Sequence, residues 1–356
     1  MIEDVWSERG TTPDAIAAAL RRLLRERYAA NRALAPARVI NLVVVVDRSQ
    51  KHKIAQQLDH LGRHGSSRTI LCAVAPRRRR LDAIAAMNEL HVPNGALGLL
   101  HERVEIDIGP QHLPHLGTLI GPLLVSGLPT ALWCPQHEQT IEALRDTIDV
   151  ILVDSDSGRD ASGALASAAE LAQSAYVVDM AWIRTTSWRE RLAASFDPPD
   201  RLAALGSLTR LSIRHRTGYL ASALLLTGWL ASRMQWKTRP LAVGQRTGLH
   251  GMIGAPSGDG EVAITIDPVA ESGQGVAGVA ASYGEGFSLS LDLVRGGVRV
   301  RERSSRAGQA VWMALEATPA EGEILGEAVR QAMLRDLTYG PALDAAQQLA
   351  VTPAAS

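Results

Sequence analysis

The sequence predicts an α/β protein with two domains: an N-terminal domain built on a doubly wound, mostly parallel sheet, followed by an α+β domain with an antiparallel meander. Three observations support this fold class. The chain has 356 residues, more than one hydrophobic core usually serves. Apolar, β-branched runs alternate with helical patterns as far as residue 178, and short alternating strands separated by glycine turns follow between residues 262 and 303.

The first domain, for which we predict the bounds 1–172, starts with a helix from Pro13 to about Tyr28 that Thr12 can cap. The later segments are predicted from their periodicity and their turn residues. The predicted strands cover residues 39–46, 69–74, 104–108, 130–133 and 150–153, and a further strand at 176–178 lies at the edge of this domain or in the join to the next. The predicted helices cover residues 54–62, 81–90, 113–124, 141–145 and 164–171. This alternation is typical of a largely parallel sheet with helices on both faces.

One segment of this domain, from Ile108 to His137, contains no Asp, Glu, Lys or Arg, although these four types make up 21% of the chain. Its leucines recur at helical spacing between two predicted strands, which indicates a buried strand–helix–strand unit. We therefore expect its polar side chains, among them Gln111, His112 and His115, to lie in the two loops that such a unit presents to solvent.

The second domain is predicted to span residues 173–340 and to open with an alternating strand (209–215) and a long apolar helix (219–234). The meander strands are predicted at residues 262–266, 276–283, 287–293 and 298–303, and glycine turns separate the last three. Residues 341–356 are rich in Ala, Gln and Pro and contain few large apolar side chains. We therefore predict that they form a mobile tail.

Charge and composition argue against several classes of function. The chain has 37 basic and 37 acidic residues, so no overall field favours nucleic acid or a membrane. The basic run Arg77–Arg80 contains no aromatic residue for base stacking, and a solvated loop is its preferred interpretation. Two cysteines, the lack of a basic and apolar leader, and uncharged runs that are short or interrupted by proline predict a cytoplasmic protein without a transmembrane helix.

A candidate ligand crevice follows from the rule that parallel sheets bind ligands beyond the carboxyl ends of their strands. The residues at or after these ends are Asp47, Gln111, His112, His115, Trp133 and Asp154. Such a crevice could hold a sugar or a phosphate, and a helix starting near His112 would offer backbone N–H groups to an anion. The alternative is that these residues are ordinary polar loop ends.

The histidines and cysteines give weaker indications of chemistry. His112 and His115 could place two nitrogens on a metal ion, as in a zinc hydrolase, but Pro114 lies between them and no further ligand stands at a defined spacing. A capping or hydrogen-bonded histidine pair is the preferred interpretation. Cys72 and Cys134 could form a thiol pair if their strands are neighbours, or could be small buried hydrophobes. Because no G-x-S-x-G or P-loop motif occurs, and no G-x-G-x-x-G motif follows the first predicted strand, we predict no catalytic residue, metal or cofactor.

Two groups of residues are candidates for binding a partner. The first, at the junction of the predicted domains, consists of Trp182, Arg184, Trp188 and Arg189. The second consists of Arg299, Arg301 and Arg303, which alternate along one face of a predicted strand. Aromatic and arginine side chains are enriched at interfaces, although aromatics also pack internally and an arginine row is also compatible with a solvated face.

Five blocks of sequence resemble the family of glucose-6-phosphate dehydrogenase assembly proteins known as OpcA. They are RVINLVVVV (Arg38–Val46), GRHGSSRTILCAV (Gly62–Val74), GPQHLPHLGTLIGPLLVSGLPTALWCP (Gly109–Pro135), AWIRTTSWRERLAASFDPP (Ala181–Pro199) and LLLTGWLASRMQW (Leu224–Trp236). The blocks occur in order across both predicted domains. The family often has Trp-Trp-Pro where this chain has Trp133-Cys134-Pro135.

The resemblance implies a non-catalytic cytoplasmic protein that binds the NADP-linked glucose-6-phosphate dehydrogenase of the oxidative pentose phosphate pathway. It implies that this protein activates the dehydrogenase and favours its active oligomer. The alternative function is a sugar-phosphate-binding sensor or enzyme that uses the crevice near His112.

Overall fold

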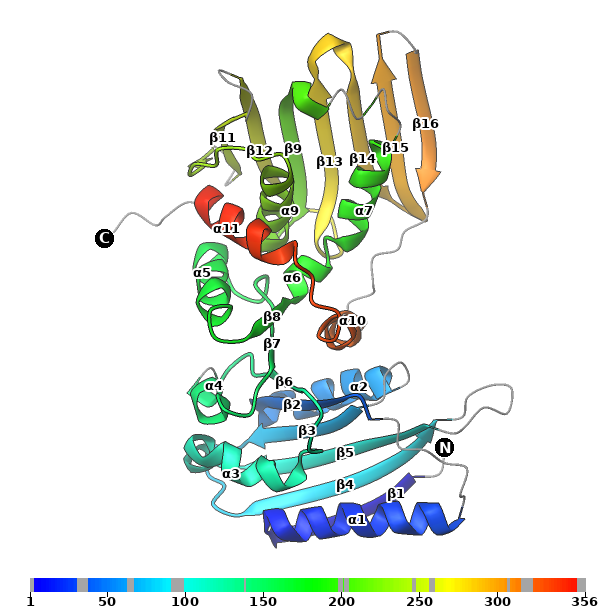
Figure 1. Ribbon diagram of the computed structural model, residues 1–356, viewed down its shortest axis with the longest axis vertical. Helices are drawn as coiled ribbons and strands as arrows, with labels where there is room; N and C mark the ends of the chain where they lie inside the picture. The colour runs from blue at the N-terminus through cyan, green and yellow to red at the C-terminus, as the bar shows by residue number, and fades with distance from the viewer. Residues whose placement is uncertain are drawn as a thin grey trace. The chain divides into compact units, whose positions relative to one another are not determined.

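A computed structural model describes residues 3–30, 38–62, 67–90, 99–137, 139–197, 201, 205–244, 248–255, 260–305, 308–314 and 323–350. Within it the chain forms two compact units (Figure 1). Unit 1 comprises Met1–Val153, Ala175–Val178 and Leu325–Leu334, and unit 2 comprises Asp154–Ser174, Asp179–Ile324 and Arg335–Ser356. The chain therefore passes between the units several times, and the helix at residues 161–171 belongs to the second of them.

Unit 1 is built on an eight-stranded sheet with the order β1-β4-β5-β3-β2-β6-β7-β8. Its strands are β1 (Glu3–Thr11), β2 (Ile40–Asp47), β3 (Ser67–Val74), β4 (Leu81–Leu90), β5 (Leu99–Ile108), β6 (Thr130–Trp133), β7 (Val150–Val153) and β8 (Tyr176–Asp179). The pairs that join β5, β3, β2, β6 and β7 are all parallel. From β5 to β8 the order is that of dinucleotide-binding α/β sheets, with its reversal between β2 and β6. The predicted doubly wound, mostly parallel sheet is confirmed.

The prediction of a helix at residues 81–90 is wrong, because this segment is strand β4, antiparallel to both β1 and β5. Its buried side chains Ala83, Ala85 and Met87 alternate along the strand and face the core. An apolar run this short and rich in alanine fits either period, so the periodicity alone could not separate a strand from a helix. The neighbouring strands β1 and β5 make this segment a strand, because it pairs with both of them. The sequence did not predict β1.

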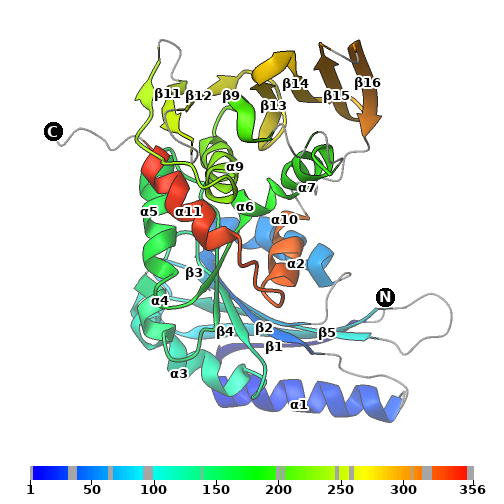
Figure 2. The same ribbon diagram turned by 45° about the horizontal axis from the view of Figure 1, so that its top comes forward.

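Helices cover both faces of this sheet, α1 and α3 one face and α2 the other (Figure 2). The helical segments are α1 (Pro13–Ala30), α2 (Lys51–Gly62), the 3-10 helix η1 (Arg48–Gln50), η2 (Pro110–His115), α3 (Leu116–Ile120), η3 (Gly121–Leu123), α4 (Gln139–Leu144) and α10 (Ile324–Gln331). The Thr12 hydroxyl accepts a hydrogen bond from the Ala15 N–H at 3.3 Å, as expected of the cap of α1. The uncharged stretch is core, since Leu116, Ile120 and Leu123 are fully buried. Its helix is divided into three short pieces, because its prolines lack the N–H group that a continuous helix requires.

Unit 2 contains a second eight-stranded sheet with the order β10-β11-β12-β9-β13-β14-β15-β16. Its strands are β9 (Leu208–Arg216), β10 (Ala242–Val243), β11 (Leu249–Gly254), β12 (Glu261–Val269), β13 (Val276–Tyr283), β14 (Ser288–Val294), β15 (Gly297–Ser304) and β16 (Gly308–Ala314). Its helices are α5 (Ala161–Leu171), α6 (Met180–Ile183), α7 (Thr186–Ser195), α9 (Leu220–Arg233) and α11 (Tyr339–Leu349), with 3-10 turns η4 (Leu205–Ser207) and η5 (Gly284–Gly286). Among the described strands of this sheet only the β9–β12 pair is parallel, so the predicted antiparallel meander is confirmed.

The prediction of a mobile tail from residue 341 is wrong as far as Ala350, because α11 packs with its buried Leu343, Ala346 and Leu349. The alanines that made this segment look weakly apolar let it approach α9 closely at Gly228. Residues 351–356, and Pro198 and Pro199 of the junction, lie outside the described residues. In the part of the chain that is described, no helix is both long and apolar enough to cross a membrane.

Candidate functional site

The point at which the strand order of unit 1 reverses is bridged by a histidine and a carboxylate. His137, after β6, lies with its Nε2 atom 3.1 Å from Oδ1 of Asp47 at the end of β2. Beside this pair, the Gln136 amide donates to Oε1 of Gln50 at 3.1 Å. Trp133, the last residue of β6, is partly buried. The structure therefore brings together Asp47 and the loop after Trp133, and their polar groups bond to one another.

The polar side chains of η2 form hydrogen bonds with the backbone of nearby turns. Nδ1 of His112 accepts a hydrogen bond from the Gly109 N–H at 2.9 Å, so this imidazole caps the turn that precedes it. The Gln111 amide donates to the carbonyl oxygen of Arg78 at 2.8 Å. His115 is exposed at the start of α3. No group of three or more His, Cys, Asp or Glu suited to a metal ion occurs among the described residues.

The two cysteines are both buried, and they are not on neighbouring strands. Cys72 is on β3 and Cys134 follows β6, with β2 between these two strands. Burial raises the pKa of the Cys72 thiol to about 12, which keeps it protonated. Its environment is that of a small hydrophobe.

Asp154, the last predicted crevice residue, belongs to unit 2, where it forms a bidentate ion pair with Arg184 at 2.7 and 2.8 Å. The same guanidinium group reaches Asp156 at 3.2 Å. Asp156 also accepts hydrogen bonds from the backbone N–H and the hydroxyl of Ser222 in α9. Only 7% of the Arg184 side chain and 2% of the Asp156 side chain are exposed, so the cluster is a buried one that ties α6 to α9.

The aromatic residues of the junction pack inside unit 2. Trp182 and Trp188 are 4% and 2% exposed. Trp182 donates from its indole N–H to Asp336 at 2.9 Å, and the Arg189 guanidinium carbon lies 3.6 Å from the centroid of the Trp182 ring. The ring of Tyr339 in α11 also packs against Trp182, and the two ring centroids are 5.6 Å apart. The junction candidates are therefore internal contacts between α6, α7 and the start of α11.

Asp179, the last residue of β8, is a buried titratable residue that the sequence reasoning missed. It is completely buried and caps α6. Its Oδ1 atom accepts from the N–H groups of Ser155 and Ala181, and its Oδ2 atom lies within hydrogen-bond distance of the Ser155 hydroxyl and the Tyr339 phenol. No cation is among these partners. Burial raises the pKa of Asp179 to about 6, although the hydrogen bonds from Ser155 oppose the change.

The raised pKa of Asp179 predicts that unit 2 loses stability as the pH rises from about 4 to about 6, because its carboxyl is protonated in the folded state and ionised in the unfolded state there. The Asp179→Asn variant is neutral throughout, and its amide can donate where a protonated Oδ2 would. At pH 8 we expect this variant to have a free energy of unfolding about 1–2 kcal/mol above that of the natural protein. Near pH 4 we expect the difference to vanish. Urea unfolding across this pH range measures it, and an identical pH slope for both proteins would refute the assignment.

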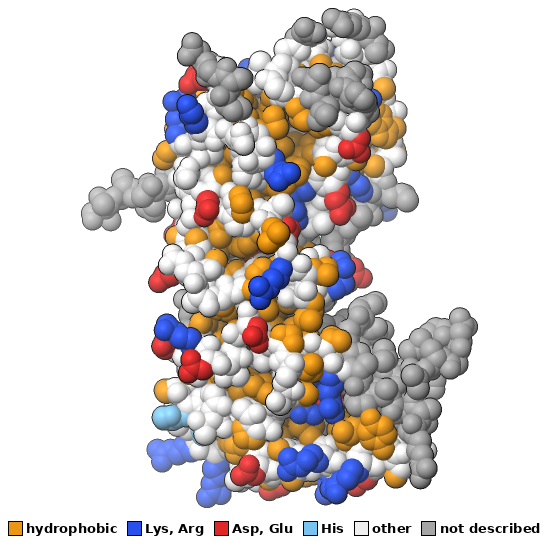
Figure 3. Space-filling model, viewed as in Figure 1, with side chains coloured by type: hydrophobic (Ala, Val, Ile, Leu, Met, Phe, Trp, Pro, Cys, Tyr) orange, Lys and Arg blue, Asp and Glu red, His pale blue; other side chains and the backbone are white. Residues whose placement is uncertain are grey.

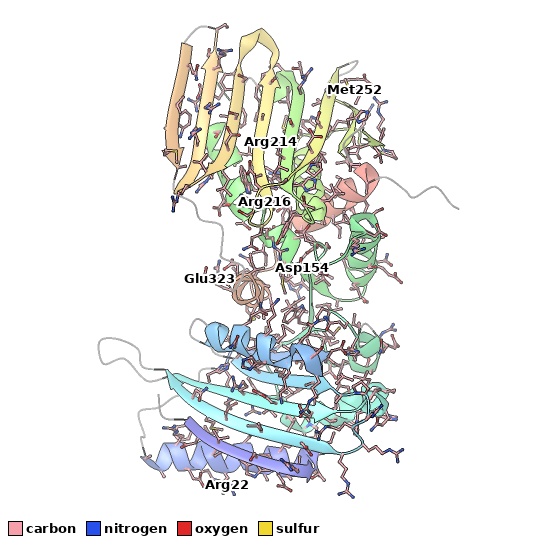
Figure 4. The ribbon with its side chains drawn as sticks, turned by 180° about the vertical axis from the view of Figure 1, so that it is seen from behind. Arg22, Asp154, Arg214, Arg216, Met252 and Glu323 are labelled. Carbon is pink, nitrogen blue, oxygen red and sulfur yellow. The ribbon has the colours of Figure 1, made fainter. Side chains whose placement is uncertain are left out.

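One face of the unit 2 sheet carries an excess of arginines, and no described helix lies across it (Figure 4). We call the outward side of β9, β13, β14, β15 and β16 the basic face. Its charged residues are Arg210, Arg214, Arg299, Arg301, Arg303 and Asp292. Arg214 pairs with Asp292, whereas no described residue forms an ion pair with Arg299, Arg301 or Arg303. The sequence-predicted arginine row therefore lies on a larger positive surface.

The centre and the edge of the basic face suit close contact with another surface. Between the arginines stand small side chains such as Ala280, Ser282 and Ser290, which project little from the sheet. At the edge, β16 exposes Val311 and Met313 opposite Arg301 and Arg299, at 55% and 53% of their surface. Figure 3, seen from the side opposite to Figure 4, shows hydrophobic side chains at the margin where β16 lies in Figure 1.

These features define a class: a two-unit α/β protein with a dinucleotide-type sheet order in one unit and an open, basic, antiparallel sheet in the other. A family model for the N-terminal domain of the protein described as "Glucose-6-phosphate dehydrogenase subunit" matches residues 30–170. A second model, for the C-terminal domain of the same protein, matches residues 175–342. The chain belongs to the OpcA family of glucose-6-phosphate dehydrogenase assembly proteins.

Two curated relatives carry the provisional name OxPP cycle protein OpcA. The protein from Synechococcus elongatus is 34% identical over 127 residues, and that from Synechocystis sp. is 32% identical over 143 residues. The alignments cover 34% and 39% of this chain, and 28% and 30% of the relatives, so the chain matches less than a third of their length. The solved structure of apo scyllo-inositol dehydrogenase from Lactobacillus casei aligns over 88% of this chain and 96% of that chain, at 11% identity. Its TM-score of 0.42 is too low to support any inference.

Proposed function

We propose that the chain is a non-catalytic cytoplasmic factor that binds glucose-6-phosphate dehydrogenase and favours its active oligomer. The observation that carries this proposal is the match of both family models, which together extend from residue 30 to residue 342. The predicted crevice adds support, because Asp47 is paired with His137 and His112 caps its own turn. Neither histidine is arranged with a nucleophile and an oxyanion site.

The basic face is the docking surface that charge complementarity favours, with an acidic surface of the dehydrogenase as its occupant. Arg299, Arg301 and Arg303 would pair with carboxylates, and Val311 and Met313 would supply apolar contact beside them. The four junction candidates, Trp182, Arg184, Trp188 and Arg189, would then act by holding the helices behind the sheet. To activate its target, the protein must bind the active oligomer more tightly than the inactive form, by about 1.4 kcal/mol for a tenfold shift.

Reversing the charge of the arginine row tests this docking surface. We expect the triple variant R299E/R301E/R303E to bind the cognate dehydrogenase at least about tenfold more weakly, because like charges would then face each other. Activation should be lost at concentrations that saturate the natural protein. Co-elution and dehydrogenase kinetics measure both effects, and added salt should weaken the natural complex.

A charge-matched control is R21E/R22E/R25E, on the exposed side of α1 in unit 1. It should co-elute with the dehydrogenase and activate it as the natural protein does. If both triple variants bind equally well, the docking surface is elsewhere. If the natural chain neither co-elutes with the dehydrogenase nor changes its kinetics at micromolar concentration, the proposed function itself is wrong.

A further inference from the structure

A hollow of about 840 Å³ in unit 1 is lined mainly by arginines. Five of its eight lining residues are Arg48 and the consecutive Arg77, Arg78, Arg79 and Arg80. Arg48 directly follows β2, and the other four connect β3 to β4. The hollow therefore lies at the carboxyl edge of the parallel strands, where sheets of this type bind their ligands.

The arginine loop has a fixed backbone. The Arg78 N–H donates to the Ala75 carbonyl at 3.1 Å across a turn with Pro76 at its second position. The Ala75 N–H donates to the Ile108 carbonyl at 2.8 Å, and Gln111 holds the carbonyl oxygen of Arg78. Because these bonds already order the loop, a ligand would bind without the entropy loss of ordering it.

The charge of the hollow is only partly compensated. Arg48 pairs with Asp107 and Arg78 pairs with Asp82. Arg77, Arg79 and Arg80 are exposed, and in the described part of the chain no ion pair involves them. Three uncompensated cations within four consecutive residues repel one another, and a multivalent anion would remove that repulsion. Guanidinium groups form paired, charge-assisted hydrogen bonds with phosphate oxygens in particular.

We propose that this hollow binds a small molecule that carries at least two phosphate groups, such as a sugar bisphosphate or a nucleoside diphosphate. Its volume falls within the range of about 300–1,000 Å³ that is typical of small-molecule sites. The turn after β2, Asp47–Gln50, contains no glycine, so a pyrophosphate cannot lie on that helix as in dinucleotide-binding proteins. The phosphates are held instead by the arginine loop that follows β3. This proposal does not depend on binding to the dehydrogenase.

Calorimetric titration of the full chain with inorganic pyrophosphate, at fixed ionic strength, tests the proposal. We expect one pyrophosphate per chain, bound at least about tenfold more tightly than orthophosphate, because the second phosphate engages further guanidinium groups. The variant R77A/R79A/R80A should lose at least about tenfold in pyrophosphate affinity. Circular dichroism establishes that this variant is folded, which is expected since the three side chains are exposed.

Two controls separate this site from general charge and from the docking surface. R21A/R22A/R25A removes as many exposed arginines from α1 and should bind pyrophosphate normally. R77A/R79A/R80A should still co-elute with the dehydrogenase, whereas R299E/R301E/R303E should still bind pyrophosphate. The proposal is overturned if millimolar pyrophosphate does not bind, if orthophosphate binds equally well, or if the α1 variant loses as much affinity. Tighter binding of a short oligonucleotide or of polyglutamate at the same salt concentration would also overturn it.

Discussion

Replacing Arg184 with methionine is expected to lower the free energy of unfolding of unit 2 by about 3–5 kcal/mol. Methionine keeps most of the aliphatic packing but removes the charge that two buried carboxylates share. Asp154, whose side chain is 19% exposed, would lose a bidentate pair, and Asp156, whose side chain is 2% exposed, would lose its cation. A buried carboxylate without a partner is far more costly than an exposed one. Urea unfolding followed by tryptophan fluorescence measures this loss, since Trp182, Trp188, Trp229, Trp236 and Trp312 all lie in unit 2.

Arg239→Met is the matched control within the same unit. Arg239 pairs with Glu261, and these side chains are 53% and 48% exposed. Removing an exposed pair of this kind changes stability by about 0–1 kcal/mol. Combining Arg184→Met with Asp156→Asn should recover part of the loss, because burial already raises the pKa of Asp156 to about 7 and an amide is neutral without taking up a proton. Equal effects of the Arg184 and Arg239 variants would show that burial of the cluster does not govern its contribution.

Replacing Gly228 with alanine is expected to destabilise unit 2 by about 3 kcal/mol, even though alanine is the better helix former. A Cβ atom at this position of α9 would lie 2.2 Å from the Ala342 carbonyl oxygen and 2.8 Å from the Ala346 nitrogen of α11. Both are backbone atoms, so the helices would have to move apart. The helix-propensity gain is only about 1 kcal/mol, and the steric term therefore decides the sign.

Gly340→Ala provides the control in α11 itself. Gly340 is exposed, and no atom lies within 4 Å of the position that its Cβ would take. We expect this variant to be as stable as the natural protein or slightly more stable, by a few tenths of a kcal/mol. Thermal unfolding of both variants would decide the matter. A Gly228→Ala protein at least as stable as the natural one would mean that α9 and α11 are not in close contact.

Much of the fold could be predicted from local patterns. The β-branched run of β2 is buried on both faces of a parallel sheet, and it was found because such a strand is apolar along its whole length. The glycine turns of the meander were equally clear. Segments of small residues were not: β4 was predicted as a helix and α11 as a tail, because alanine is compatible with several structures until its neighbours are known.

The candidate site was likewise predicted in part from local sequence, whereas its contacts depend on the tertiary structure. The rule that ligands lie beyond strand ends directed attention to Asp47, Asp154 and Gln111, and each lies in a polar cluster of the structure. It could not show that Asp154 pairs with Arg184, which is 30 residues further along the chain. The Arg77–Arg80 run, interpreted as a solvated loop, lines a hollow with Arg48 from another strand end. Only the sheet order brings these arginines together.

The sequence by itself determined the family, the doubly wound sheet, the antiparallel meander and the alternating arginine row, because each of these is encoded by residues close together in the chain. The tertiary structure alone decided which charges are buried and which are free. The junction tryptophans and Arg184 lie inside unit 2, since partners from α9 and α11 cover them. Arg299, Arg301 and Arg303 lie on an open sheet face. Burial depends on contacts between distant segments, and for that reason local sequence patterns cannot reveal it.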